Sequence, residues 1–271
     1  MAAAATELAN TVIYEMKSIA SSYEKVYVMF SGGRDSLTTL DLTVKALGKD
    51  EVEALFIDTG IATPGLREYV TNVTRQYGIR LNVVSPEHDF FELVLRKGFP
   101  MIKYRWCKEY LKIRPLKKFV GEVKEKHRNI LLVTGLRADE SWFKSRASKV
   151  YYHPILHTYV YAPIFEWSGD QVKEYMRSEG LLECPLYLLY GKAYDCWCTV
   201  FKTPADFALL AINHPKLFAK FVEVEGKLRS GGSALYYNKQ KVYLRDIAKN
   251  PWEYLKRYPI GYKCPFCRVL M

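Results

Sequence analysis

The 271-residue sequence lacks any apolar run near the roughly 18 to 20 residues that a membrane-spanning helix requires. It also lacks a basic segment followed by an apolar stretch, the mark of an export signal, so we expect a cytoplasmic protein with no membrane partner. Only six cysteines occur, too few for a scaffold held together by disulfides. These absences indicate a globular protein whose cysteines are free for metal or redox chemistry.

Acidic residues are also scarce, because 29 Asp and Glu face 40 Lys and Arg, which gives a net charge of +11. Residues 96–128 hold 12 Lys and Arg against three Glu, and residues 227–268 hold ten against two acidic residues. Two basic segments on a mildly acidic body favour a polyanionic ligand such as nucleotide phosphates, tRNA or DNA. The alternative is a solvated basic surface.

Short apolar runs alternate with helical periodicity along the first two thirds of the chain. The runs predict strands at 26–30, 53–58, 80–85, 129–137 and 158–167. We therefore expect an α/β fold with a doubly wound, mostly parallel five-stranded sheet, whose ligands bind at the carboxyl ends of the strands. We divide the chain into a nucleotide-binding domain, 1–183, and a small cysteine-containing C-terminal subdomain, 184–271.

Helices are expected around these strands. An amphipathic helix opens the chain, a second ends near Gly48, and others begin at Pro64 and Pro115. Residues 168–171, Ser-Gly-Asp-Gln, have the pattern of a capping box at the start of a further helix. The last predicted helical stretch runs from Pro204 to about Leu228.

The sharpest motif is Ser31-Gly32-Gly33-Arg34-Asp35-Ser36, between the first predicted strand and the first long helix. Glycines let a backbone approach an anion closely, serines donate hydrogen bonds, and a helix N-terminus supplies free N–H groups and a positive dipole end. The motif is neither a Walker A sequence nor GxGxxG. It predicts a phosphate-binding loop rather than an ordinary turn.

The loop resembles the SGGxDS hallmark of the PP-loop adenine-nucleotide α-hydrolases. Further segments, in order, are similar to the phosphoadenylylsulfate (PAPS) reductase-like branch of that superfamily. They are Asp58-Thr59-Gly60, Arg105-Trp106-Cys107 with Leu111-Lys112 and Pro115, Gly135-Leu136-Arg137 through Ser141 with Arg146, and Pro163 with Trp167 and Asp170.

The resemblance implies roles for these positions. The loop would hold the phosphates of ATP, or the sulfate or phosphate end of adenylyl sulfate or PAPS, with Asp35 orienting the loop or a Mg²⁺ ion. Thr59 and Gly135 would belong to the nucleotide site, and Arg137 and Arg146 would neutralise charge on the departing anion. Asp58 is either a ribose or metal contact or a turn residue. Lys112, with Lys108 one turn away, either reaches phosphates or lies on a solvated face.

The cysteines form two close pairs, Cys196-Trp197-Cys198 and Cys264-Pro265-Phe266-Cys267. Four such thiolates suit Zn²⁺ or an iron–sulfur cluster such as [4Fe-4S], unless they are simply buried free thiols. Cys107 is a catalytic candidate and also a possible substitute for one ligand. Cys184 is expected to be a buried small hydrophobic residue. Cys196 to Val200 is also similar to a segment of the DNA-phosphorothioation sulfurtransferases, which carry an iron–sulfur cluster, with a spacing one residue shorter here.

The ATP-type loop and the lack of an ECGxH-type tail separate this sequence from the true PAPS reductases. We therefore expect an enzyme that adenylates an acceptor, releases pyrophosphate and transfers sulfur from a donor protein, with nucleic acid as a candidate acceptor. One alternative is a thiol- or cluster-dependent reductase of adenylyl sulfate or PAPS that yields sulfite and uses a thioredoxin-like reductant. The other is a non-catalytic nucleotide-binding module that recruits a sulfur carrier.

Overall fold

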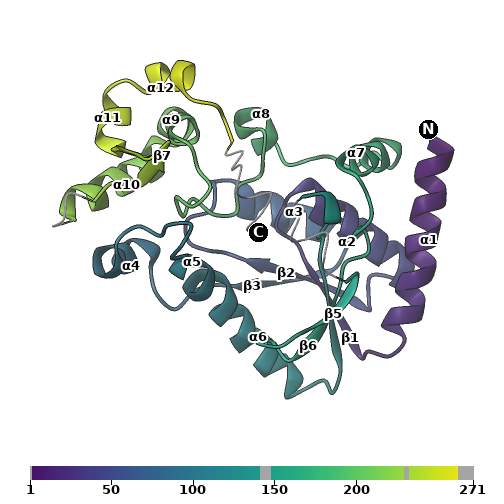
Figure 1. The fold of residues 1–271 in the computed structure, drawn as a ribbon. Coiled ribbons are helices and arrows are strands. Elements are labelled where there is room, and N and C mark those ends of the chain that lie inside the picture. The colour runs from purple at the N-terminus through teal and green to yellow at the C-terminus, as the bar shows by residue number, and fades with distance from the viewer. Residues whose placement is uncertain (1, 141–147, 229–231, 262–271) are drawn as a thin grey trace.

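The computed structural model describes residues 2–140, 148–228 and 232–261. Its centre is a six-stranded sheet, which Figure 1 shows between the helices. The strand order is β3-β2-β1-β4-β6-β5. Five of these strands pair in parallel, and β5 runs antiparallel to β6 at the edge. The bounds are β1 Lys25–Met29, β2 Val52–Ile57, β3 Arg80–Val84, β4 Ile130–Val133, β5 Val150–His153 and β6 Thr158–Tyr161.

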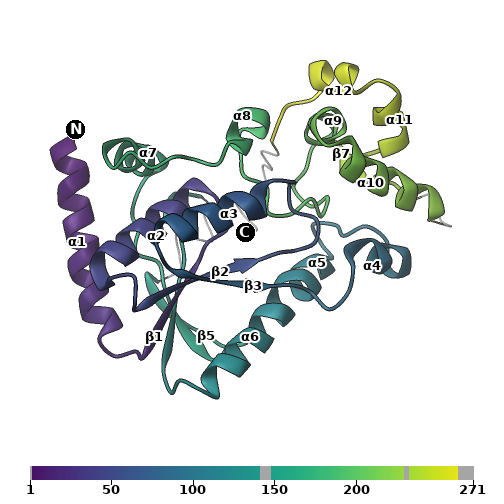
Figure 2. The same ribbon diagram turned by 180° about the vertical axis from the view of Figure 1, so that it is seen from behind.

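Helices cover both faces of the sheet, which confirms the doubly wound α/β fold. One layer holds α1 Ala2–Ala20, α2 Arg34–Leu47, α3 Leu66–Gln76 and α7 Gly169–Ser178. Figure 2 shows α2 and α3 in front of the strands. The opposite face packs against α6 Arg114–Lys124, which continues from α5 Trp106–Lys108 through a π-helical turn, η1 Glu109–Ile113.

Side chains along β1 alternate between the two faces of the sheet, so this strand contributes residues to two hydrophobic cores. Val26 and Val28 belong to the large core beneath α1, α2 and α3. Tyr27 points to the other face, where it packs edge-on against Phe119 of α6 with ring centroids 5.3 Å apart. Because a central parallel strand is buried on both sides, its residues are apolar in an unbroken run.

The remaining elements gather beyond the carboxyl ends of the strands (Figure 1). They are α4 Phe90–Lys97, the 3₁₀ turn η2 Ala138–Glu140, α8 Leu186–Tyr190, α9 Pro204–Asn213, α10 Pro215–Lys227, β7 Leu235–Tyr237, β8 Gln240–Val242, α11 Leu244–Lys249 and α12 Pro251–Arg257. Phe91 of α4 packs against Phe221 of α10, with ring centroids 4.9 Å apart. The large core therefore continues into the C-terminal region, and the division at 183/184 stays a prediction.

Four details of the predicted elements were wrong. β4 ends at Val133, whereas the predicted strand ran to residue 137. The sheet has a sixth strand, β5, which the five-strand prediction omitted. β6 ends at Tyr161 because the chain then turns, with the Phe165 N–H donating to the Ala162 carbonyl. The helical stretch after Pro204 is two helices, since Pro215 cannot continue α9.

The capping box is confirmed, as Ser168 and Gln171 cap α7 reciprocally. Within the described residues, no helix is long and apolar enough to cross a membrane.

Candidate nucleotide site

The phosphate loop leaves β1 and enters α2 through two glycines in different conformations. Gly32 has a φ of +81°, a left-handed conformation that favours glycine. Gly33 is the N-cap of α2 in an extended conformation. The Ser36 hydroxyl donates to the Gly33 carbonyl over 2.9 Å, and the Ser31 N–H donates to Ser36 Oγ over 3.3 Å. The loop is thus held by its own serines at a helix N-terminus.

This loop opens into a cavity of about 310 Å³ at the carboxyl ends of β1, β2 and β4. The strand order reverses between β1 and β4, which is where a doubly wound sheet binds its ligands. The cavity combines an apolar wall with the loop and a few polar groups. Its lining is Met29, Phe30, Ser31, Gly33, Arg34, Asp35, Ser36, Leu55, Ile57, Lys112, Thr134, Gly135, Leu136, Tyr187 and Asp195.

Gly135, just after β4, lies against the backbone at the start of α2. A Cβ placed on Gly135 would be 2.7 Å from the Asp35 carbonyl carbon and 2.8 Å from the Ser36 nitrogen. Atoms that close cannot coexist with a side chain, so glycine is required by the approach of two backbone segments. Gly135 therefore joins the β4 loop to the phosphate loop.

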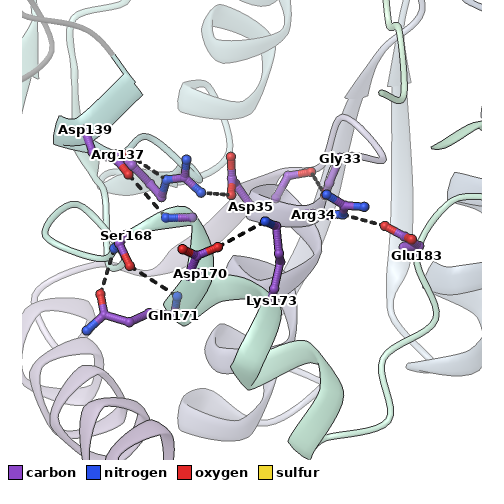
Figure 3. Close-up of polar contacts among 12 residues, drawn as sticks. Gly33, Arg34, Asp35, Arg137, Asp139, Ser168, Asp170, Gln171, Lys173 and Glu183 are labelled. Carbon is purple, nitrogen blue, oxygen red and sulfur yellow. Dashed lines mark hydrogen bonds and ion pairs between the residues drawn. The ribbon is translucent and has the colours of Figure 1, made fainter. Parts of the chain in front are cut away.

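Arg137 lies between the starts of two helices (Figure 3). Its Nη1 donates to Asp35 Oδ1 over 2.6 Å, and its Nε donates to Asp139 Oδ1 over 3.1 Å. Asp139 in turn accepts the Gly169 N–H at the start of α7. Only 13% of the Arg137 side chain is exposed. In this structure the guanidinium holds Asp35 in place, and its predicted contact with a departing anion stays a prediction.

Asp58 and Thr59 lie beside the cavity, but neither is among the described residues that line it. Asp58 accepts the Gly60 N–H and pairs with Arg67 at 3.2 Å, the geometry of a turn residue. The Thr59 hydroxyl donates to the Asp195 carbonyl over 2.7 Å. Thr59 therefore fastens the segment before the Cys196 pair to the end of β2.

Lys112 reaches the cavity from η1, a kind of helical turn that often occurs at functional sites. Its Nζ donates to Asp195 Oδ2 over 2.5 Å. Burial disfavours the cation, but the Asp195 carboxylate outweighs that cost and raises the pKa of Lys112. Lys112 is thus a fixed positive charge, whereas Lys108 lies exposed on the solvated side.

Three of the predicted cysteine ligands meet beside this ion pair. The Cys107 and Cys196 thiols are each hydrogen-bonded to the Cys198 sulfur, which raises their pKa values and lowers that of Cys198. Trp197 anchors the pair, since its indole Nε1 donates to Thr63 Oγ1 over 3.0 Å. Among the described residues, no three His, Cys, Asp or Glu side chains are arranged as a metal site requires. The three thiols form a hydrogen-bonded cluster.

The sequence predictions also named Arg146, Cys264 and Cys267 as site residues and Cys184 as a buried residue. Arg146, Cys264 and Cys267 lie outside the described residues. Cys184 is buried, with 1% of its surface exposed.

Two side chains of the site were not predicted. Asp195 carried one local signal, its position next to Cys196, but Tyr187 carried none. Both reach the cavity through tertiary contacts with Lys112 and Arg34.

Comparison with known proteins identifies the family of the chain. A family model described as the phosphoadenosine phosphosulfate reductase domain matches residues 25–196. An uncharacterized protein of Methanocaldococcus jannaschii is 36% identical over 214 residues, which is 76% of this chain and 43% of that protein. The chain therefore spans less than half of that relative. The adenosine 5′-phosphosulfate reductase 2 of Bacillus subtilis is 24% identical over 72% of this chain and 82% of that protein.

A solved structure has the same fold. The phosphoadenylyl-sulfate reductase of Candida auris, in a phosphate complex, aligns with a TM-score of 0.54 at 19% sequence identity. The alignment covers 71% of this chain and 94% of that one. Since the family model spans the sheet, the phosphate loop and the segment up to Cys196, the chain belongs to the phosphoadenosine phosphosulfate reductase domain family.

Proposed function

We propose that the chain binds ATP in the cavity and adenylates an oxygen of an acceptor as the first step of a sulfur transfer. The observation that carries the proposal is the Ser31–Ser36 loop, which opens into a cavity joined to three clustered thiols through Lys112 and Asp195. The loop offers an anion seat, and the thiols offer a place where sulfur could be held.

In the proposed reaction the acceptor oxygen attacks the α-phosphorus, the bond to the β-phosphate oxygen breaks, and pyrophosphate leaves. A sulfur nucleophile then displaces AMP from the acceptor. The amides of the loop and the Lys112 charge would stabilise the anion that leaves. A Mg²⁺ ion at Asp35 would share that carboxylate with Arg137, which already accounts for one of its oxygens.

The second candidate is a reductase that accepts two electrons from a dithiol and splits adenylyl sulfate or PAPS into sulfite and AMP or its 3′-phosphate. The family and the name of the Bacillus relative favour it. Production of AMP and pyrophosphate from ATP in the presence of acceptor supports the first candidate, whereas sulfite release supports the second. A module that only binds nucleotide would give neither.

Replacing Gly33 by valine should weaken ATP and pyrophosphate binding about a hundredfold, or about 2.8 kcal/mol, because the methyl groups fill the anion seat. The extended backbone of Gly33 accepts valine, so the fold should persist. Asp35→Ala should weaken binding about tenfold by releasing Arg137. Calorimetric titration measures both. The control is Asp170→Ala, an aspartate at the start of α7 whose side chain is 93% exposed. Wild-type affinity in both loop variants would refute the assignment.

We also propose a metal site whose ligands are cysteine thiolates. An all-sulfur donor set suits Zn²⁺ or an iron–sulfur cluster, and Cys107 and Cys196 both interact with Cys198. A bound metal would have to draw these three thiols into a ligand arrangement that the described residues do not have. The fourth ligand would be Cys264 or Cys267. Such a group would hold the end of the chain near the cavity.

We expect protein purified without oxygen to contain iron with acid-labile sulfide, or zinc, and Cys198→Ala to lose it. Cys184→Ala is the matched control, since Cys184 is a buried free cysteine that lies outside the thiol cluster. Elemental analysis checks both variants. Wild-type protein without iron or zinc, or full metal content in Cys198→Ala, would exclude this site.

For the acceptor we propose a nucleic acid. Lys103, Lys108, Lys117 and Lys118 of the basic segment are exposed, which supports a nucleic-acid backbone as partner. The Lys118 Nζ lies 3.7 Å from Glu87 Oε1, so this carboxylate compensates part of the positive charge of the basic segment. We also propose a sulfur donor protein for the first candidate reaction, a thioredoxin-like reductant for the second, and a cytoplasmic location.

A further inference from the structure

A tyrosine from a distant segment contacts the phosphate loop. The Arg34 backbone N–H, one of the amides that open α2, donates to the Tyr187 hydroxyl over 3.2 Å. A Cβ placed on Gly33 would lie 3.7 Å from the same hydroxyl oxygen. Tyr187 also lines the cavity. Its hydroxyl therefore lies at the place where the loop meets a bound anion.

The Arg34 side chain is held by the same segment. Its guanidinium lies 4.2 Å from the centre of the Tyr187 ring and pairs with the Glu183 carboxylate. Figure 3 shows Arg34 directed toward Glu183 and away from Arg137. Because this charge is engaged by Glu183, the group beside Gly33 is the neutral tyrosine hydroxyl.

We propose that Tyr187 of α8 contacts the anion that binds on the phosphate loop. While its oxygen accepts the Arg34 N–H, its own proton is donated to an oxygen of a phosphate or sulfate group bound on the loop. A neutral donor suits either anion. Burial raises the pKa of Tyr187, so the hydroxyl keeps this proton at neutral pH. The inference rests on the proposed nucleotide function and adds a residue to its binding site.

Tyr187→Phe tests it, because the change removes the hydroxyl and keeps the ring beneath Arg34. We expect affinity for inorganic pyrophosphate and for ATP to fall about tenfold, the effect of losing a hydrogen bond to a charged group. Binding of adenosine, which has no phosphate, should not change. Tyr190→Phe is the matched control: the Tyr190 hydroxyl of the same helix is buried without a hydrogen-bond partner among the described residues. Calorimetry with the full chain supplies the affinities, and ligand-detected NMR follows adenosine.

The outcomes separate this inference from the function on which it rests. If the wild type binds pyrophosphate and Tyr187→Phe binds it within twofold as tightly, Tyr187 does not contact the anion, although the nucleotide site stands. An equal loss of adenosine affinity, or the same loss in Tyr190→Phe, would show general disruption and overturn the inference. If the wild type binds neither pyrophosphate nor ATP, the proposed function fails and this inference fails with it.

Discussion

Gly135→Ala should abolish nucleotide binding and lower the free energy of unfolding by about 3 kcal/mol, the upper end of what overpacking usually costs. The new Cβ would lie 2.7 and 2.8 Å from backbone atoms of Asp35 and Ser36, which cannot rotate away as a side chain could. The start of α2 or the loop after β4 must therefore shift. Either shift moves the amides of the phosphate loop away from the positions that hold an anion.

Gly121→Ala is the control for this glycine. Gly121 lies in α6 and has no heavy atom within 4 Å of a built Cβ, so alanine should stabilise the helix by about 0.5 to 1 kcal/mol. Urea denaturation measures stability, and titration with pyrophosphate measures binding. A Gly135→Ala protein that binds pyrophosphate as tightly as the wild type would show that the two segments move apart without cost.

Glu225→Ala should remove about 3 to 5 kcal/mol of stability from the C-terminal region, because three amides lose their acceptor. The Glu225 carboxylate is 4% exposed and accepts the N–H groups of Ala234, Leu244 and Arg245 at 3.0 to 3.2 Å. These amides precede β7 and begin α11. One side chain of α10 thus organises the hairpin and the next helix.

Hydrogen exchange localises this effect, since amides of 232–257 should lose protection more than those of the sheet. The matched control is Glu223→Ala, two residues earlier on α10, where the carboxylate is exposed and pairs only with Lys227 among the described residues. Because solvent screens this exposed pair, its loss should leave stability nearly unchanged. Equal stability of the two variants would mean that the three amides find other partners.

The central parallel strands could be predicted because burial on both faces makes them apolar runs, as in Val26 to Met29. The edge strand β5 could not, since its residues are exposed or half-buried and carry no such run. The break at Pro215 was readable in principle, but the apolar periodicity on both sides of it obscured the boundary.

The phosphate loop was predictable because its residues are contiguous and their chemistry is local. The meeting of Cys107 with Cys198 was suggested only by a family resemblance, and it depends on the position of α5, which carries Cys107, beside the segment after α8. Tyr187 contacts Arg34 across 153 residues of sequence, and no local pattern encodes such a contact. Side chains that complete a site from another element are therefore the part that sequence reasoning omits.

The π-helical turn η1 changes the phase of a long helix. In a regular α-helix, residues five apart are about 140° apart around the axis, since each residue turns about 100°. Cys107 and Lys112 are five apart, yet both reach the segment 195–198, because the wider turn between them brings their side chains to one side. A regular α-helical turn over these same residues would place the thiol and the lysine about 140° apart. The link between cavity and cysteines thus depends on the backbone conformation of this turn as well as on the identity of its residues.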